Sequence, residues 1–166
     1  MRRVLRWLGL GAAALILAGC LVALAARFSD GPIGPFPGGP LAAGELVGEP
    51  VADWSFAKDL ASIELEANPA KPRSRTAWLA VVDGRLYVPC GFPESKAWPH
   101  QVLRDGRVVL RIDGRRYPFR ALRETDPERL RRLGAEVARK YGVGDEEAAV
   151  AGRDVWFFRM DPRPAA

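Results

Sequence analysis

The sequence predicts a mainly β domain with flanking helices, preceded by one N-terminal transmembrane helix. Two Asp-Gly pairs, Asp83-Gly84 and Asp113-Gly114, each lie between two β-rich apolar runs. A type I′ turn needs positive φ at both of its central residues, so each pair indicates a β-hairpin. The third observation is an apolar run without charges from Trp7 to Ala26. We expect the two hairpins to curl into one small barrel that the rest of the chain anchors or covers.

The composition is that of one folded domain with an accessory segment. The chain has 166 residues, of which 48% are hydrophobic, and a formal net charge of +5. This length suits one domain of ordinary size, and the apolar content excludes a largely disordered chain. The arginines are scattered along the predicted strands, and the sequence contains no RNA- or DNA-binding motif. We therefore expect no nucleic-acid partner.

Few residues carry the chemistry of a metal site or of a nucleophilic enzyme. The only cysteines are Cys20, in the apolar run, and Cys90, at the end of a predicted strand, and the only histidine is His100. There is no Cys/His cluster for zinc, and no nucleophile-elbow sequence accompanies the histidine. From the sequence we assign no metal ligand and no catalytic residue.

The apolar run has the length and the flanking charges of a membrane anchor. Its 20 residues would span about 30 Å as a helix, which is the thickness of the hydrocarbon core. Arg2, Arg3 and Arg6 precede the run and Arg27 follows it, so the positive-inside rule keeps the N-terminus in the cytoplasm. The chain would then cross a bacterial inner membrane once, with its domain facing the periplasm or the exterior.

A lipoprotein signal is the alternative interpretation of the same run. The segment from Leu17 to Cys20 matches a bacterial lipobox, in which the signal is cut before a cysteine that is then lipidated. The run stays apolar from Leu21 to Ala26, whereas a processed lipoprotein usually turns polar after its cysteine. Either interpretation attaches the chain to a membrane.

We divide the chain into an anchor or signal at residues 1–27, a linker at 28–50 and a domain at 51–166.

The linker is rich in glycine and proline. Several Gly-Pro and Pro-Gly pairs favour extended conformations with little regular structure. Such a segment would lift the domain off the bilayer. In a second interpretation it lies along the domain surface, because Ile33, Phe36 and Leu41 are apolar.

Patterning places the remaining elements around the two turns. We expect strands at residues 62–67, 75–82, 85–88, 107–112, 115–121 and 154–160, and helices at 54–60, 96–104 and 145–150. A longer helix begins at Thr125, which forms a capping box with Glu128, and ends at Gly142. The strand at 75–82 is apolar on both faces, so we expect it to be covered on both, with Trp78 in the core.

This order of elements resembles the split β-barrel of the pyridoxamine-phosphate oxidase-like flavin-binding superfamily, nearest to its deazaflavin-dependent nitroreductase branch. Three segments carry the resemblance. They are Arg73-Ser74-x-Thr76 before a strand, the hairpin from Val82 to Val88, and the run from Trp98 to Tyr117 with its short helix, strand, Asp-Gly turn and strand. Residues 51–160 fit the whole domain.

The resemblance implies a groove in which FMN or a deazaflavin lies against the barrel, often at the interface of a homodimer, and acts on a small-molecule substrate. The implied cofactor-binding residues are Arg73, Ser74, Arg75, Thr76, Cys90, Gly91, Lys96 and Trp98. The first four would meet the phosphate, because arginine gives charge-assisted hydrogen bonds of fixed direction. The flavin ring would lie against the other four residues, where glycine permits close approach of the backbone.

A noncatalytic domain of the same fold is the alternative. Arg75 stands where the family often has glycine, and Phe92, Pro93 and Glu94 replace a loop that tends to be rich in glycine. A domain that has lost its cofactor would serve protein or envelope contacts. Its groove would be filled by its own side chains, such as Phe92 and Trp98.

Overall fold

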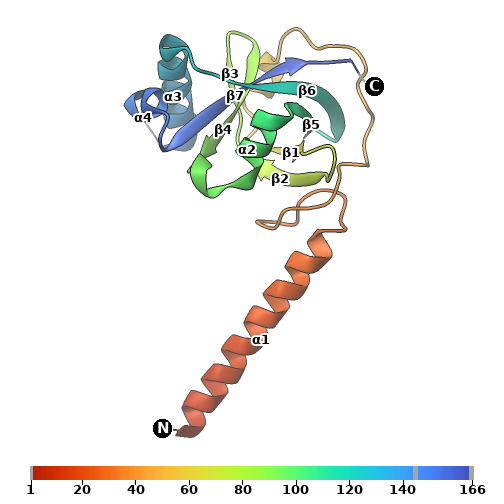
Figure 1. Cartoon of the computed structure of the whole chain (residues 1–166), viewed down its shortest axis with the longest axis vertical. Coiled ribbons are helices and arrows are strands. Elements are labelled where there is room, and N and C mark those ends of the chain that lie inside the picture. The colour runs from red at the N-terminus through yellow and green to blue at the C-terminus, as the bar shows by residue number, and fades with distance from the viewer. Residues whose placement is uncertain (1, 144–145, 165–166) are drawn as a thin grey trace.

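The computed structural model describes residues 2–143 and 146–164, and it consists of one long helix followed by a β-rich domain (Figure 1). Helix α1 (Arg2–Ala26) extends away from the domain as a separate rod. Its part from Arg6 to Ala26 is 21 residues long and apolar enough to cross a membrane. Asp145, where we expected an extra helical turn to begin, lies outside the described residues.

The domain is a curled antiparallel sheet of seven strands with helices beside it, and the expected mainly β fold is confirmed. The strands are β1 (Ile63–Ala67), β2 (Arg73–Ala77), β3 (Ala80–Val82), β4 (Arg85–Gly91), β5 (Arg107–Ile112), β6 (Arg115–Arg123) and β7 (Val155–Pro162). The helices are α2 (Ala97–Arg104), α3 (Pro127–Tyr141) and α4 (Glu146–Ala151), with 3-10 turns η1 (Ser55–Ala57) and η2 (Pro93–Ser95). Neighbouring strands follow the order β2-β1-β5-β6-β7-β4-β3.

Both predicted hairpins are present with the predicted turns. Val82 pairs with Arg85 across Asp83-Gly84, and Ile112 pairs with Arg115 across Asp113-Gly114. The φ angles are 53° and 69° in the first turn and 48° and 75° in the second, as a type I′ turn requires. The local chemistry of the Asp-Gly pairs therefore sets the register of β3 with β4 and of β5 with β6.

The predicted single strand at 75–82 is wrong, because the chain breaks at Trp78 and Leu79. The first half belongs to β2 and the second half is β3, and these two strands form opposite edges of the sheet. Trp78 is also not a core residue, since 44% of its surface is exposed. The apolar residues on both faces of the 75–82 segment have a different role in each half. β2 borders a cavity, whereas β3 is covered by α3.

Two helix starts differ from the prediction. Asp126 rather than Thr125 caps α3, because its side chain accepts a hydrogen bond from the backbone N–H of Glu128. Pro127 follows as the first helical residue, where its missing N–H costs nothing. The expected helix at 54–60 is only the short turn η1, in which Asp53 Oδ1 accepts from the N–H and the hydroxyl of Ser55.

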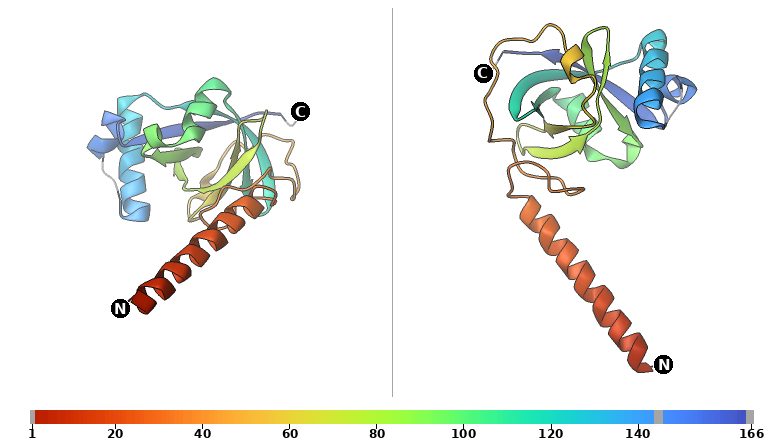
Figure 2. Two further views of the ribbon diagram at one scale, coloured as in Figure 1. Left: turned by 60° about the horizontal axis from the view of Figure 1, so that its bottom comes forward. Right: turned by 180° about the vertical axis from the view of Figure 1, so that it is seen from behind.

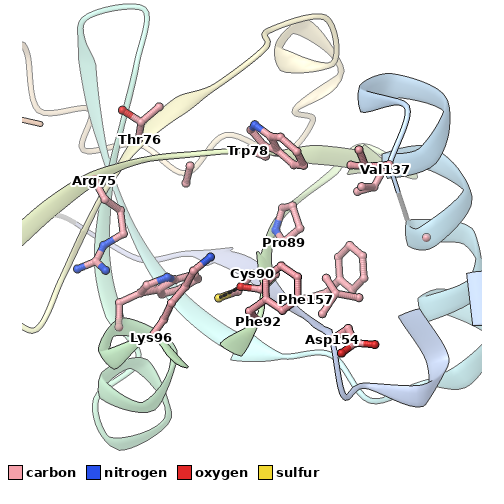
Figure 3. Close-up of a pocket in the computed structure, with 16 residues that line it drawn as sticks. Arg75, Thr76, Trp78, Pro89, Cys90, Phe92, Lys96, Val137, Asp154 and Phe157 are labelled. Carbon is pink, nitrogen blue, oxygen red and sulfur yellow. Dashed lines mark hydrogen bonds between the residues drawn. The ribbon is translucent and has the colours of Figure 1, made fainter. Parts of the chain in front are cut away.

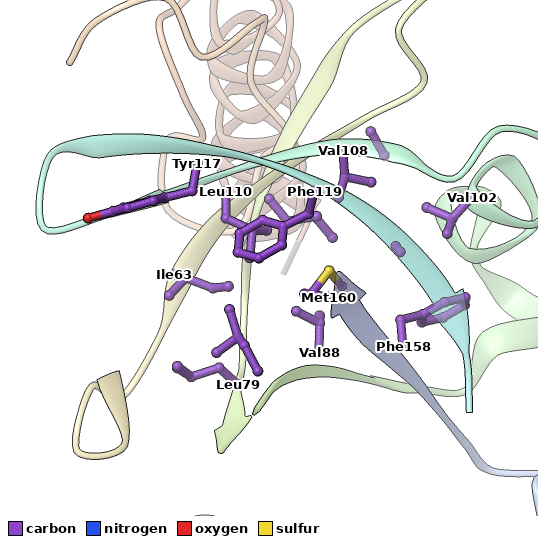
Figure 4. Packing of buried hydrophobic residues seen from close by; sticks show 14 of the residues in the cluster. Ile63, Leu79, Val88, Val102, Val108, Leu110, Tyr117, Phe119, Phe158 and Met160 are labelled. Carbon is purple, nitrogen blue, oxygen red and sulfur yellow. The ribbon is translucent and has the colours of Figure 1, made fainter. Parts of the chain in front are cut away.

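The main hydrophobic core fills the inside of the curled sheet (Figure 4). Phe119, Leu110 and Val88 come from three different strands and are fully or almost fully buried there. A second cluster lies on the outer side, where Leu130, Leu133 and Val137 of α3 pack against β3, β4 and β7. The predicted apolar stripe of α3 therefore covers the sheet from outside.

The Gly/Pro-rich segment lies along the barrel as a strap, which we define as residues 27–47 (Figure 2). Gly38 and Ser74 exchange two backbone hydrogen bonds, at 2.9 and 3.3 Å, so the strap covers the free edge of β2. The Arg111 guanidinium pairs with both Asp30 and Glu64, and Arg116 donates to the carbonyl oxygens of Leu41 and Gly44. Residues 28–47 are therefore part of the domain surface rather than a free spacer.

The two Asp-Gly turns allow a matched test of the space around each glycine. A Cβ on Gly84 would lie 2.8 Å from Asp53 Oδ1, whereas a Cβ on Gly114 would meet nothing within 4 Å. Gly114→Ala is expected to cost about 1 kcal/mol, because alanine is strained at positive φ. Gly84→Ala is expected to cost about 1 kcal/mol more from the added clash. Urea unfolding of the full chain in detergent measures both, and equal losses would contradict the contact with Asp53.

Candidate functional site

A cavity of about 570 Å³ opens between β2, β4, α2 and α3 (Figure 3). This volume lies within the range of roughly 300–1,000 Å³ that small-molecule sites occupy. Its wall is mostly apolar, with a few polar side chains gathered at the ends. The lining residues are Arg75, Thr76, Ala77, Trp78, Pro89, Cys90, Gly91, Phe92, Lys96, Trp98, Gly134, Val137, Val143, Asp154, Val155 and Phe157.

One end of the cavity is cationic. Arg75 points inward from β2, and Lys96 lies beside it on the residue before α2 (Figure 3). The Arg75 guanidinium lies 5.7 Å from the ring centre of Trp98, and its Nε is buried without a hydrogen-bond partner in the described chain. Burial lowers the pKa of Arg75 to about 10. A desolvated cation that lacks a counter-ion favours an anionic ligand group, which would complete its hydrogen bonds.

The opposite end carries the aromatic residue at the chain break. Trp78 stacks on Tyr141 of α3, with ring centres 4.3 Å apart and planes 6° apart. The Tyr141 hydroxyl accepts from the N–H of Leu79 at 3.1 Å and lies 2.9 Å from the carbonyl oxygen of the same residue. The end of α3 therefore fixes the break between β2 and β3 and holds Trp78 at the wall of the cavity.

The floor is formed by β4, β7 and α2. Trp98 is almost fully buried and packs on Phe158 with ring centres 5.2 Å apart. Pro89 and Phe157 contribute further apolar surface. An aromatic ring system would find flat apolar partners here, since offset and edge contacts between rings add to simple burial.

Cys90 presents a thiol to the cavity. Burial raises the pKa of this thiol to about 11, and the cations Lys96 and Arg75 oppose that shift only in part. The thiolate is the nucleophilic form of cysteine, so the protonated side chain is inert near neutral pH. Cys90 therefore contributes shape and a weak donor to the site, and not a nucleophile.

Acidic groups lie away from the cationic end. Asp154 lines the cavity on the side opposite to Arg75 and Lys96 (Figure 3). Glu94 is exposed on the loop after β4, with its carboxylate 3.8 Å from Nε2 of His100. The site is thus polarised, and an anionic group is favoured only beside Arg75 and Lys96.

The structure brings six of the eight predicted cofactor-binding residues to this one cavity. They are Arg75, Thr76, Cys90, Gly91, Lys96 and Trp98. The other two lie against the strap instead. Ser74 is fully buried and donates from its hydroxyl to the carbonyl oxygen of Gly39 at 2.7 Å, and Arg73 donates to that of Arg27 at 3.2 Å. The division follows position along β2, because the strap crosses the strand at Ser74 through Gly38 and Gly39, whereas the cavity begins at Arg75.

Sequence reasoning missed the wall formed by α3. Gly134 and Val137 of α3, with Trp78 and Phe157, line the cavity from elements that the resemblance did not connect with a cofactor. The aromatic pair of Trp78 and Tyr141 is separated by 63 positions, and no local pattern marks such a contact. The one sequence signal for this wall was the aromatic residue Trp78, which we had expected to lie in the core.

Comparison with known proteins yields matches among solved structures alone. No protein-family model matches the chain, and no curated protein matches it. HutZ, described as the heme storage protein of Vibrio cholerae, aligns with a TM-score of 0.52 at 13% identity over 66% of this chain and 87% of its own. A conserved hypothetical protein of Mycobacterium tuberculosis aligns with a TM-score of 0.51 at 19% identity, over 72% of this chain and 86% of its own. A NimC/NimA family protein of Clostridium acetobutylicum aligns with a TM-score of 0.50 at 14% identity, over 62% of this chain and 75% of its own.

These matches establish the fold. The chain shares its fold with these three proteins, and the split β-barrel fold expected from the resemblance to the pyridoxamine-phosphate oxidase-like superfamily is confirmed. Chains with lower TM-scores include one provisionally named as a pyridoxamine 5′-phosphate oxidase from Listeria innocua and one named as F420 reductase. Identities below 20% show shared architecture, and the chemistry of the site has to be argued from its own residues.

The Cys90 thiol gives a pH test of the cavity. Because its pKa is raised to about 11, alkylation by iodoacetamide should stay slow at pH 8.5 and still be rising near pH 10. The proton is bound more tightly in the folded state, so this group stabilises the fold below the pKa of an unfolded thiol and loses that contribution as pH rises through 11. The Cys20→Ala variant leaves Cys90 as the only thiol. The same variant in its unfolded state is the control. An alkylation midpoint below pH 9 would contradict the burial of this group.

Proposed function

We propose that the chain is a membrane-anchored, extracytoplasmic split-barrel protein that binds FMN or a deazaflavin and acts as an oxidoreductase on a small molecule. The observation that carries this proposal is the cavity with an unpaired, desolvated Arg75 at one end and aromatic walls along its length. The fold is shared with proteins whose names refer to F420, heme and FAD. That likeness supports a cofactor-binding role of this general kind.

The residues present fit a flavin-type group in two respects. The cationic end offers Arg75 and Lys96 to a phosphate or carboxylate, whereas the Thr76 side chain lies on the face of β2 opposite to Arg75 (Figure 3). The walls offer Trp98, Phe157 and Trp78 to a flat ring. The orphaned Nε of Arg75 is the strongest sign of a ligand, because a buried donor without an acceptor costs free energy that a bound anion would recover.

Each part of the chain has a separate role in this proposal. A bound flavin would supply the redox chemistry, and the protein would hold and orient it. Arg75 and Lys96 would fix the anionic end, and Trp98 would exclude water from the floor of the cavity. The protonated Cys90 would leave the ring free of covalent attachment, since its thiolate is not populated near neutral pH.

The membrane address is part of the proposal. Helix α1 has the length and composition of a span, and a signal sequence passes the same test. We favour a retained anchor because the run stays apolar from Leu21 to Ala26, whereas a processed lipoprotein usually turns polar after its cysteine. The arginines before the span then favour a cytoplasmic N-terminus and a domain outside the cytoplasm.

A noncatalytic domain is the second candidate, and a specific observation favours it. The strap occupies Ser74 and Arg73, which would otherwise be available to a phosphate. The groove is nevertheless open, because Phe92 lines it with 71% of its surface still exposed and Trp98 belongs to the floor. A domain used only for protein contacts does not explain an open cavity with an unpaired cation.

Titration of the purified full-length protein with FMN and with a deazaflavin tests this proposal. We expect quenching of cofactor fluorescence by one of them, and Arg75→Met is expected to weaken binding about tenfold or more, because it removes charge-assisted hydrogen bonds. Arg85→Met is the matched control, since this arginine is exposed at the start of β4 and does not line the cavity.

The two candidates give different results in this experiment. Binding that falls with Arg75→Met and not with Arg85→Met supports the flavin site. Failure of the unaltered protein to bind either cofactor contradicts it and leaves the noncatalytic domain. Equal loss in both variants would show that general positive charge, and not the cavity, attracts the cofactor.

A further inference from the structure

The junction between α1 and the barrel is a fixed structure rather than a flexible tether. The Ser29 hydroxyl lies 2.7 Å from the carbonyl oxygen of Ala26, and the N–H of Gly39 donates to the carbonyl oxygen of Ser29 at 3.0 Å. Arg73 of β2 donates to the carbonyl oxygen of Arg27. The end of the helix is thus bonded both to the strap and to the sheet edge. The orientation of the barrel relative to α1 follows from these contacts.

Two apolar side chains near this junction face away from the protein. Phe28 has 85% of its surface exposed, although it follows α1 by only two positions, and Ile33 has 44% exposed. Ile33 is held by two backbone hydrogen bonds with Phe36, at 3.0 and 3.1 Å, so its exposure belongs to an ordered turn. Isolated apolar residues on a surface need no explanation, but these two lie directly beside the end of an apolar helix.

The charges around these residues are positive. Arg27 follows the helix, Arg73 bonds to its carbonyl oxygen, and Lys71 lies two positions before Arg73 in the turn between β1 and β2. None of the three has an ion-pair partner in the part of the chain that the structure describes. The nearby carboxylate of Asp30 pairs with Arg111, which it shares with Glu64. We call Arg27, Phe28, Ile33, Lys71 and Arg73 the juxtamembrane surface.

We propose that the juxtamembrane surface rests on the headgroup layer of a bilayer that contains anionic lipids. This inference rests on the proposal that α1 spans the membrane. Aromatic and aliphatic side chains at the end of a span sit in the interfacial layer, and adjacent basic side chains are attracted by lipid phosphates. Figures 1 and 2 show the strap between the end of α1 and the edge formed by β1 and β2, so this edge faces the bilayer.

A lipid surface fits these residues better than a protein partner does. The surface is continuous with the span, because Arg27 and Phe28 directly follow the last residue of α1. Gly38 and Gly39 of the strap bond to Ser74 of β2, and Ile33 bonds to Phe36 within the strap, so these backbone groups are not offered to a peptide as a free strand edge. The strap therefore has a second role beyond covering β2, because it fixes the domain close to the bilayer.

Nitroxide probes on the full-length protein in lipid vesicles test this inference. In a Cys20→Ala background, probes are placed at Ile33→Cys, at Leu15→Cys in the middle of α1, and at Phe56→Cys on η1, all of which are exposed. Collision with oxygen, which dissolves in lipid, is compared with collision with a water-soluble nickel chelate. We expect the probe at position 33 to collide with nickel less than the one at 56 and more than the one at 15, as a site in the headgroup layer would. The probe at 56 should collide mainly with nickel.

Each outcome separates the two levels of the proposal. A probe at position 15 that is exposed to nickel overturns the membrane span and the juxtamembrane surface together. A probe at 15 in lipid with a probe at 33 that behaves like the one at 56 overturns the juxtamembrane surface alone. Neither result depends on a bound cofactor, so the flavin proposal is tested separately.

The role of charge needs a second comparison. Adding phosphatidylglycerol to phosphatidylcholine vesicles is expected to reduce nickel collisions at position 33 about twofold, because anionic headgroups attract basic side chains. Lys71→Glu with Arg73→Gln should remove this dependence. Arg131→Glu with Arg85→Gln makes the same change in charge at exposed positions far from the junction and should retain it. The same lipid dependence in both double variants would overturn the assignment of the charges.

Discussion

The curl of the sheet depends on one short connection. β2 and β3 form its two opposite edges, yet only Trp78 and Leu79 separate them in the chain. Three peptide units reach about 11 Å at most, so the edges of the seven-stranded sheet have to approach each other. At this point the backbone of Leu79 bonds to the Tyr141 hydroxyl instead of to a neighbouring strand. The barrel stays split there, and α3 closes the gap.

This one constraint also creates the candidate site. A strand that continued straight through Trp78 would have paired its backbone and buried its ring. Because the chain turns away, Trp78 stands free of the sheet and stacks on Tyr141, and the space between β2, β4 and α3 stays open. The same curl brings Arg75 of β2 toward Lys96 and Trp98 (Figure 3). The cationic end and the aromatic wall are therefore two consequences of the connection between the sheet edges.

The strap shows how a segment of low complexity becomes part of a fold. It contributes few apolar side chains, and its attachment depends on backbone groups bonded to Ser74, Arg111 and Arg116. The guanidinium groups suit this task, because each presents several donors in fixed directions to carbonyl oxygens and carboxylates. By covering the free edge of β2, the strap also removes a site at which another chain could add a strand.

The sequence by itself determined the features that short-range chemistry controls. Both Asp-Gly turns, the apolar stripe of α3 and the apolar α1 follow from residues within a few positions of each other, as backbone sterics and periodicity require. Only the tertiary structure decided that Ser74 bonds to the strap while Arg75 faces the cavity, and that Trp78 is exposed. Those outcomes depend on partners 35 to 62 positions away in the chain. A local pattern cannot specify such contacts, because it records which faces are apolar and not which distant element covers them.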